Sequence, residues 1–265
     1  MAAFDIAASA ALMDDLTAIG ARVALAVREQ AGTGVVRSKA DGSPVTAADD
    51  SAEALIRDAL AALAPAVPIV SEEHAAWQKP EIPTGEGASY FVVDPLDGTR
   101  EFIAGRDEYT INIALVAGAA PVLGLIIAPA LGVAWRGIID RRADRVAIAD
   151  GKMSPPTTIR ARPRPPQPVI MVSRSHLDPR TRAYVDGFPQ AELVRSGSAI
   201  KFGRVAEGSA DLYPRLAPTR DWDVAAGHAL IRAAGGTVTA PDGSPILYGT
   251  AQLVIPGFIA SGVSA

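Results

Sequence analysis

The stretch VVDPLDGTREF places two aspartates three residues apart at the end of an apolar run. Burying two carboxylates this close together is costly unless a cation lies between them. After Asp94, Pro95 fixes the backbone and favours a turn that presents the carbonyl oxygen of Leu96. A plain Asp-Gly turn explains Asp97 but not Asp94. Because hard cations such as Mg²⁺ prefer all-oxygen ligands, the stretch predicts a metal site.

Three further acids stand where a solvent-exposed residue is not expected. Asp49 fits a capping box with Thr46, but it also shares the predicted helix face of Ile56. Glu72 follows a short apolar strand, although two solvated acids in a loop would explain the same pattern. Asp223 lies in the first turn of a predicted helix, where the helix dipole alone favours an acid. We expect these side chains to meet the first two aspartates.

Such a group of acids would repel itself when empty and would bind divalent cations. Two Mg²⁺ ions about 3.5–4 Å apart can hold the attacking and leaving oxygens of a phosphoryl transfer. The attacking water needs a base nearby, and Thr99 with Asp49 could form a hydrogen-bonded relay to it. Gly98 and Thr99 begin a short predicted helix, and a helix N-terminus attracts phosphate. The residues therefore predict metal-dependent phosphate hydrolysis.

Helices and strands must bring these separated acids together. Residues 4–30 and 45–63 are predicted to be helices, because they are rich in alanine and other apolar residues and contain few breakers. Residues 68–71 and 91–93 are predicted to be short buried strands, and three or four more strands are expected before residue 149. The acids then lie at the ends of these elements.

A proline-rich stretch divides the chain. Residues 154–168 contain six prolines, which predict a linker or an extended edge. Beyond it, strands and helices alternate, which is typical of a layered arrangement. We therefore expect an α/β (α+β) fold in two halves. Residues 1–150 would form an N-terminal α+β half with most metal ligands, and residues 151–265 a C-terminal α/β half that completes the metal site and the substrate pocket.

Composition excludes several classes of protein. The net charge of −4 carries no basic excess, which argues against nucleic-acid binding. Without cysteine, disulfides and thiolate metal sites are excluded. Residues 113–135 carry no charge, but prolines and glycines cut them into strand lengths, so we predict no transmembrane segment. We expect a cytoplasmic protein and leave open a peripheral attachment to the inner membrane face.

Four separated motifs carry a resemblance to a known family. DPLDGT, preceded by VTAAD and SEE and followed by WDVAAGHAL, resembles the lithium-sensitive, Mg²⁺-dependent inositol monophosphatase superfamily. The resemblance covers nearly the whole chain. It implies a layered αβαβα sandwich of the inositol monophosphatase and fructose-1,6-bisphosphatase type, with two or three Mg²⁺ ions.

The same resemblance implies roles for individual residues. One metal site would comprise Glu72, Asp94 and the Leu96 carbonyl, and a second would comprise Asp94, Asp97 and Asp223. Glu72 would also bind a weaker third ion. Asp49 and Thr99 would activate the attacking water, while Gly98 and Thr99 would bind the phosphate.

Other segments point to one branch of the superfamily. KADGSPVTAAD, DGTREF, VSRSH, GSAIKFGRVAEGSADLYPR and DWDVAAGHA resemble the CysQ-type 3'(2'),5'-bisphosphate nucleotidases. The branch implies that the substrate is bound by Ser173, Arg174, Ser175, His176, Gly197, Ser198, Lys201 and Arg215. A substrate with two phosphates needs such cations in addition to the metal. Alternatively, Lys201 belongs to a solvated helix face and His176 is a residue of a turn.

The resemblance implies removal of the 3'-phosphate from adenosine 3',5'-bisphosphate, and from its sulfated relative PAPS, in sulfur metabolism. An alternative is inositol monophosphate or another sugar or polyol phosphate as the substrate. A non-catalytic binder of phosphate or Mg²⁺ is a third reading. We expect a monomer or a homodimer with a small-molecule substrate.

Overall fold

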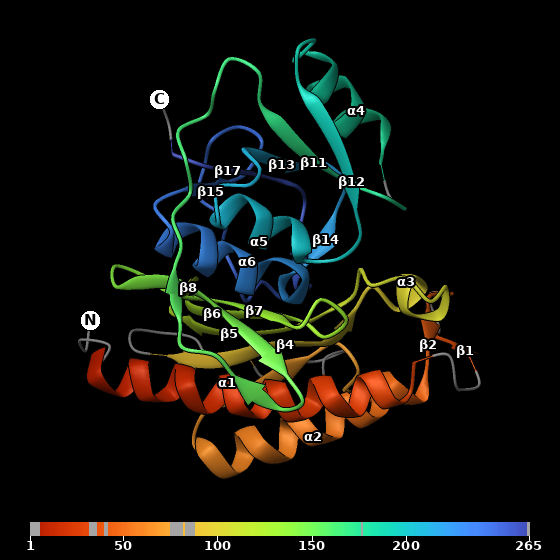
Figure 1. Ribbon diagram of the computed structural model, residues 1–265, viewed down its shortest axis with the longest axis vertical. Coiled ribbons are helices and arrows are strands. Elements are labelled where there is room, and N and C mark those ends of the chain that lie inside the picture. Colours follow the sequence, from red (N-terminus) through yellow and green to blue (C-terminus); the bar gives the residue numbers. More distant parts are fainter. Residues whose placement is uncertain are drawn as a thin grey trace.

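The computed structural model describes residues 6–31, 36–39, 42–74, 82, 88–175 and 177–263. Figure 1 shows alternating layers of helices and sheets. Helices α1 (Ile6–Glu29) and α2 (Ala47–Leu63) form an outer layer beneath the first sheet. Helices α5 (Ile200–Ala206) and α6 (Asp221–Ala233) lie between the two sheets, and α4 (Pro179–Asp186) lies outside the second. The predicted αβαβα layering is confirmed.

The first sheet has eight strands, in the order β10-β8-β7-β6-β5-β4-β3 with β9 beside β8. Their bounds are β3 Ile69–Ser71, β4 Ser89–Asp97, β5 Thr110–Ala117, β6 Ala120–Ala128, β7 Val133–Ile138, β8 Arg142–Ala149, β9 Lys152–Met153 and β10 Thr157–Thr158. Among its described strands, β3 and β4 pair in parallel, whereas the other neighbours pair antiparallel. The uncharged residues 113–135 thus form sheet strands, as predicted. Among the described residues, no helix is sufficiently long and apolar to cross a membrane.

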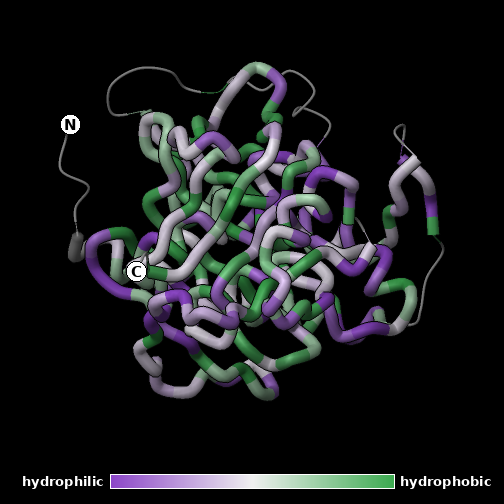
Figure 2. Tube along the Cα trace, turned by 90° about the horizontal axis from the view of Figure 1, so that it is seen from above, coloured by the Kyte–Doolittle hydropathy of each residue, from purple (hydrophilic) through white to green (hydrophobic). Residues whose placement is uncertain are grey.

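Both faces of this sheet are covered, and the strands alternate between two apolar cores. Phe91, Val93 and Ile113 face the core that includes α1 and α2. Tyr90 and Val92 face the core that includes α5 and α6. Burial on both faces explains why these strands are continuously hydrophobic rather than alternating with polar residues. In Figure 2 hydrophobic segments accordingly run through the middle of the molecule.

The second sheet has the order β12-β11-β13-β17-β15. Its bounds are β11 Val169–Ser173, β12 Glu192–Ser196, β13 Leu212–Arg215, β15 Thr237–Thr239 and β17 Phe258–Ser261. Strand β17 lies between β13 and β15 and pairs antiparallel with both. The sequence did not predict β17, nor the two-stranded pairs β1 (Arg37–Ser38) with β2 (Pro44–Val45) and β14 (Thr219–Arg220) with β16 (Val254–Ile255). The proline-rich stretch is an extended edge: β10 lies within it and pairs with β8.

Candidate metal and phosphate site

Strand β4 carries the first two aspartates through an irregularity. Asp94 pairs with Asn112 of β5 and Asp97 pairs with Thr110, so the register shifts between them. Such a bulge bends the strand and redirects its side chains. The sequence predicted a turn after Asp94, whereas the strand continues to Asp97. Gly98 then adopts a left-handed conformation with φ 94°, and helix α3 (Thr99–Ile103) begins.

The first turn of α6 brings the third aspartate to this place. Asp94, Asp97 and Asp223 offer carboxylate oxygens that all lie within 4.8 Å of one another, and we call these residues the acid cluster. The Oδ2 atom of Asp223 accepts hydrogen bonds from the Arg220 amide at 2.9 Å and from the Thr219 hydroxyl. This capping interaction uses only one oxygen of Asp223, and the other remains for the cluster.

Burial and mutual repulsion make the acid cluster costly to charge. Burial, followed by repulsion from Glu72 and Asp97, raises the pKa of Asp94 well above its ordinary value. Burial and repulsion from Asp223 raise the pKa of Asp97 to about 6. The Oδ2 atom of Asp94 is buried and finds no hydrogen-bond partner among the described residues. Because three carboxylates converge here, one with an unpartnered buried oxygen, and the cavity lining includes no soft ligand, the residues present fit a hard divalent cation.

Glu72 lies at the edge of the same site. It lines the cavity that contains the acid cluster, but its Oε1 atom is 2.6 Å from the ammonium of Lys39. Burial raises the pKa of Glu72 to about 8, although the Lys39 ammonium opposes this shift. Lys39 also contacts Glu73, so one ammonium neutralises part of both charges. Glu72 thus lies in a loop, but it is paired with Lys39 and lines the cavity, so it is not the solvated acid of the alternative reading.

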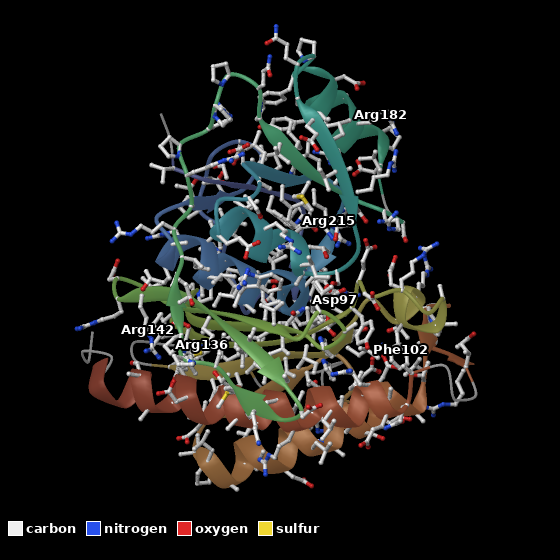
Figure 3. The ribbon with its side chains drawn as sticks, in the orientation of Figure 1. Asp97, Phe102, Arg136, Arg142, Arg182 and Arg215 are labelled. Atoms are coloured by element: carbon white, nitrogen blue, oxygen red, sulfur yellow. The ribbon has the colours of Figure 1, made fainter. Side chains whose placement is uncertain are left out.

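The cavity has a volume of about 220 Å³ and is lined by residues from both halves of the chain. In Figure 3 the labelled Asp97 and Arg215 lie where the first sheet meets the second half of the chain. The predicted site residues that line the cavity are Glu72, Asp94, Leu96, Asp97, Gly98, Thr99, Ser173, Ser175, Gly197, Ser198, Lys201, Arg215 and Asp223. Residues separated by more than half of the sequence therefore line the same cavity.

Asp49 lies immediately behind this lining. The Oγ1 atom of Thr99 is 3.0 Å from Asp49 Oδ1 and 3.2 Å from the Leu96 carbonyl oxygen. Asp49 Oδ2 accepts hydrogen bonds from the amide of Thr46 at 2.8 Å and from its hydroxyl at 2.6 Å. The two readings of Asp49 are therefore compatible, because one oxygen caps α2 and the other contacts Thr99. The carboxylate is completely buried.

Two cations line the same cavity. Lys201 is 2% exposed and donates to the carbonyl oxygens of Ser196 at 3.2 Å and of Ser198. The reading of Lys201 as part of a solvated helix face is therefore wrong. Burial lowers the pKa of Lys201 to about 8, although Asp97 opposes this shift. Arg215 extends from β13, and its charge interacts with those of Asp223 and Asp97.

Two predicted substrate residues are not among the cavity-lining residues. Arg174 forms a bidentate ion pair with Glu108, with both N–O distances 2.6 Å. Ser173 and Ser175 line the cavity, whereas Arg174 between them points elsewhere. Alternation of side chains along an extended chain accounts for this difference. His176 lies outside the described residues.

The cavity also contains residues that the sequence analysis did not select: Ser43, Pro44, Arg100, Glu101, Ala199, Phe202 and Tyr213. Tyr213 could have been found, since it stands two residues before Arg215 on the same strand face. Nothing in the local pattern distinguishes Glu101 from an ordinary acid in the first turn of a helix.

Comparison with known proteins agrees with this geometry. The sequence profile of the inositol monophosphatase family matches residues 6–262. The 3'(2'),5'-bisphosphate nucleotidases CysQ of Shigella flexneri and of Escherichia coli (strain K12) are each 40% identical to this chain, over 84% of it and 87% of theirs. The crystal structure of CysQ from Bacteroides thetaiotaomicron superimposes with a TM-score of 0.74 at 31% identity, over 94% of this chain and 97% of that chain. The chain belongs to the inositol monophosphatase family.

Proposed function

We propose that this protein is a Mg²⁺-dependent phosphatase that removes the 3'-phosphate from adenosine 3',5'-bisphosphate. The observation that carries the proposal is one cavity lined by the acid cluster and by two cations, the buried Lys201 and the half-buried Arg215. The acids suit metal ions, and the cations suit a second phosphate on the same substrate. The names of the CysQ relatives, 3'(2'),5'-bisphosphate nucleotidases, support this choice of substrate.

The metal ligands come from both halves of the chain. Glu72, Asp94 and the Leu96 carbonyl would hold one Mg²⁺, while Asp94, Asp97 and Asp223 would hold a second. When bound, Mg²⁺ supplies positive charge that attracts the phosphate oxygens and lowers the pKa of a water molecule. In this proposal residues 1–150 provide most ligands, and the second half completes the site through Asp223. A weaker third ion would share Glu72 after displacing the Lys39 ammonium.

Thr99 and Asp49 would manage the proton of the attacking water. The hydroxyl of Thr99 can accept a hydrogen bond from water while it donates to Asp49 Oδ1 at 3.0 Å. As the water attacks phosphorus, its proton would pass to Thr99 Oγ1 and that of Thr99 to Asp49 Oδ1, while the bond from phosphorus to the 3'-oxygen breaks and that oxygen takes a proton from a second water. The two bonds from Thr46 hold the carboxylate in position for this transfer. Because the pair is fixed before substrate binds, little rearrangement is needed at the moment of reaction.

The part of the cavity lined by Ser198, Lys201 and Arg215 would bind the second phosphate. The hydroxyl of Ser198 is buried without a hydrogen-bond partner among the described residues, and Lys201 lies one helical turn further on. Arg215 adds a guanidinium whose Nε atom likewise lacks a described partner. A substrate phosphate would satisfy these donors, whereas a polyol with a single phosphate would leave them unpaired. The proposal therefore favours a bisphosphate over an inositol monophosphate.

A panel of phosphate esters tests the proposal. Phosphate release from adenosine 3',5'-bisphosphate, PAPS, inositol 1-phosphate and fructose 1,6-bisphosphate would be measured with Mg²⁺ and with EDTA. We expect the nucleotides to give the highest kcat/KM, dependence on Mg²⁺ and inhibition by Li⁺. Preference for an inositol or sugar phosphate by more than about tenfold would reject the proposed substrate. Undiminished activity of Asp94→Asn would reject the proposed metal chemistry.

A further inference from the structure

One acidic side chain in the cavity has no part in the proposed chemistry. Glu101 extends from α3, is 5% exposed and lines the same cavity as Lys201 and Arg215. Its Oε1 atom accepts a hydrogen bond from the Ser175 hydroxyl at 2.6 Å. Within the described part of the chain, this is the one hydrogen bond that its carboxylate accepts. Its second oxygen, Oε2, accepts no hydrogen bond from the described residues but is not fully buried, so it is accessible from the cavity. Glu101 thus places an acceptor in a cavity otherwise suited to phosphates.

Contacts from both halves of the chain hold Glu101 in place. A Cβ atom at Gly197 would lie 2.9 Å from Glu101 Cγ and 2.7 Å from the Glu108 carbonyl oxygen. Only glycine therefore lets the loop before α5 pack directly onto this side chain. Glu101 also attracts the ammonium of Lys201 and so opposes the lowering of its pKa by burial. The carboxylate is fixed beside the proposed phosphate site rather than free to move into solvent.

The chemistry of a fixed carboxylate limits what can bind next to it. An ionised carboxylate accepts hydrogen bonds and donates none, and it repels a phosphate. The group of the substrate that faces it must therefore not be an anion and must carry an O–H or N–H. In a nucleoside bisphosphate, the sugar and the base offer such donors between and beside the two phosphates. Glu101 and the cations together would then recognise a substrate whose hydrogen-bond donor lies next to its phosphate groups.

We propose that Glu101 is a specificity-determining residue that accepts a hydrogen bond from a hydroxyl or amine of the substrate. The inference rests on the proposed nucleotide substrate and adds the donor that this substrate must present. If Glu101 only orients Ser175, its substitution should change kcat/KM by the same factor for all substrates. A residue that contacts the substrate would instead affect those that carry its donor.

The test combines substitutions in the protein with deletions in the substrate. The substrates are adenosine 3',5'-bisphosphate, its 2'-deoxy analogue, which lacks the sugar hydroxyl, and purine riboside 3',5'-bisphosphate, which lacks the exocyclic amine. For the wild-type protein we expect one analogue to have kcat/KM lower than the parent by about 10- to 100-fold, as for a lost hydrogen bond to a charged group. In Glu101→Gln, and further in Glu101→Ala, this ratio should fall towards one.

Glu108→Gln is a matched control. Glu108 lies on the loop after α3, contacts Arg174 and the Gly197 amide, and is not among the cavity-lining residues. The substitution Glu108→Gln should reduce kcat/KM for all three nucleotides by a similar factor, so that the ratio between parent and analogue stays as in the wild type. The analogue whose ratio collapses in the Glu101 variants identifies the donor as the hydroxyl or the amine.

Two results would overturn the inference. Either the wild-type protein does not discriminate against either analogue, or the Glu101 variants keep the full wild-type discrimination. Failure of the proposed function has a different signature, because the wild-type protein would then release no phosphate from any of the three nucleotides. In that case the substrate assignment fails first, and the role of Glu101 fails with it.

Discussion

Repulsion within the acid cluster should destabilise the metal-free protein, and Asp97→Asn should relieve it. Burial and the charge of Asp223 move the pKa of Asp97 from 3.8 to about 6 in the folded chain. A raised pKa in an acid means that the folded state binds the proton more tightly than the unfolded state. The destabilisation is therefore absent below pH 3.8, grows as the pH rises towards 6 and is complete above it. At neutral pH it amounts to about 3 kcal/mol.

Thermal unfolding followed by circular dichroism measures this effect. In EDTA at pH 7.5, we expect Asp97→Asn to unfold about 6–12 °C above the wild type, since each kcal/mol moves the midpoint by a few degrees. At pH 4 the two should unfold at similar temperatures, because Asp97 is then largely protonated. In excess Mg²⁺ the difference should nearly vanish, since binding at about 100 times Kd stabilises only the wild type, by about 2.7 kcal/mol.

An exposed acid ten residues further on provides the control. Asp107→Asn removes the same charge from the surface and should leave the midpoint unchanged in EDTA and in Mg²⁺. A lower midpoint for Asp97→Asn in EDTA at pH 7.5 would refute the reasoning. An equal increase in the unfolding midpoint of Asp97→Asn at pH 4 and pH 7.5 would also refute it, because the gain in stability would then not come from removal of charge repulsion.

Three further predictions follow from other contacts. Thr99→Ala should reduce kcat by about 100- to 10,000-fold with little change in KM, and Thr99→Ser should recover most of the loss in steady-state assays. Burial lowers the pKa of His228 from 6.5 to about 4, so denaturant titrations should show the stability falling as the pH drops through that range, and His228→Gln should flatten the fall. A Cβ atom at Gly227 would lie 2.2 Å from the Phe202 ring, so Gly227→Ala should reduce the unfolding free energy in urea by about 1–3 kcal/mol.

The sequence indicated Asp94 and Asp49 because these two acids depart from a local rule. Asp94 interrupts an apolar strand, and Asp49 occupies a helix face that should be apolar. Such conflicts between pattern and residue type are expected at functional sites. The layers were predictable for a related reason, since strands buried on both faces read as continuous apolar runs.

What the sequence could not provide depends on contacts between distant segments. Strand β17 has only four residues and is recognisable as a strand only through its pairing with β13 and β15. Arg174 lies in a motif associated with the substrate, but Glu108, 66 residues away, determines where its guanidinium points. Glu101 joins the site only because the loop at Gly197 packs against it. Local periodicity contains no information about such partners.

Close packing of α6 explains how three carboxylates can be held together at all. A Cβ atom at Gly124 of β6 would lie 2.1 Å from the Ala226 carbonyl oxygen, and one at Gly137 of β7 would lie 2.5 Å from Leu230 Cα. On its other side α6 packs against α5, where Gly227 meets the Phe202 ring. A helix confined in this way cannot slide to move Asp223 away from Asp97. Because movement of the backbone cannot relieve the repulsion, protonation or a bound cation must do so, and the rigidity of α6 would thereby favour the binding of a cation.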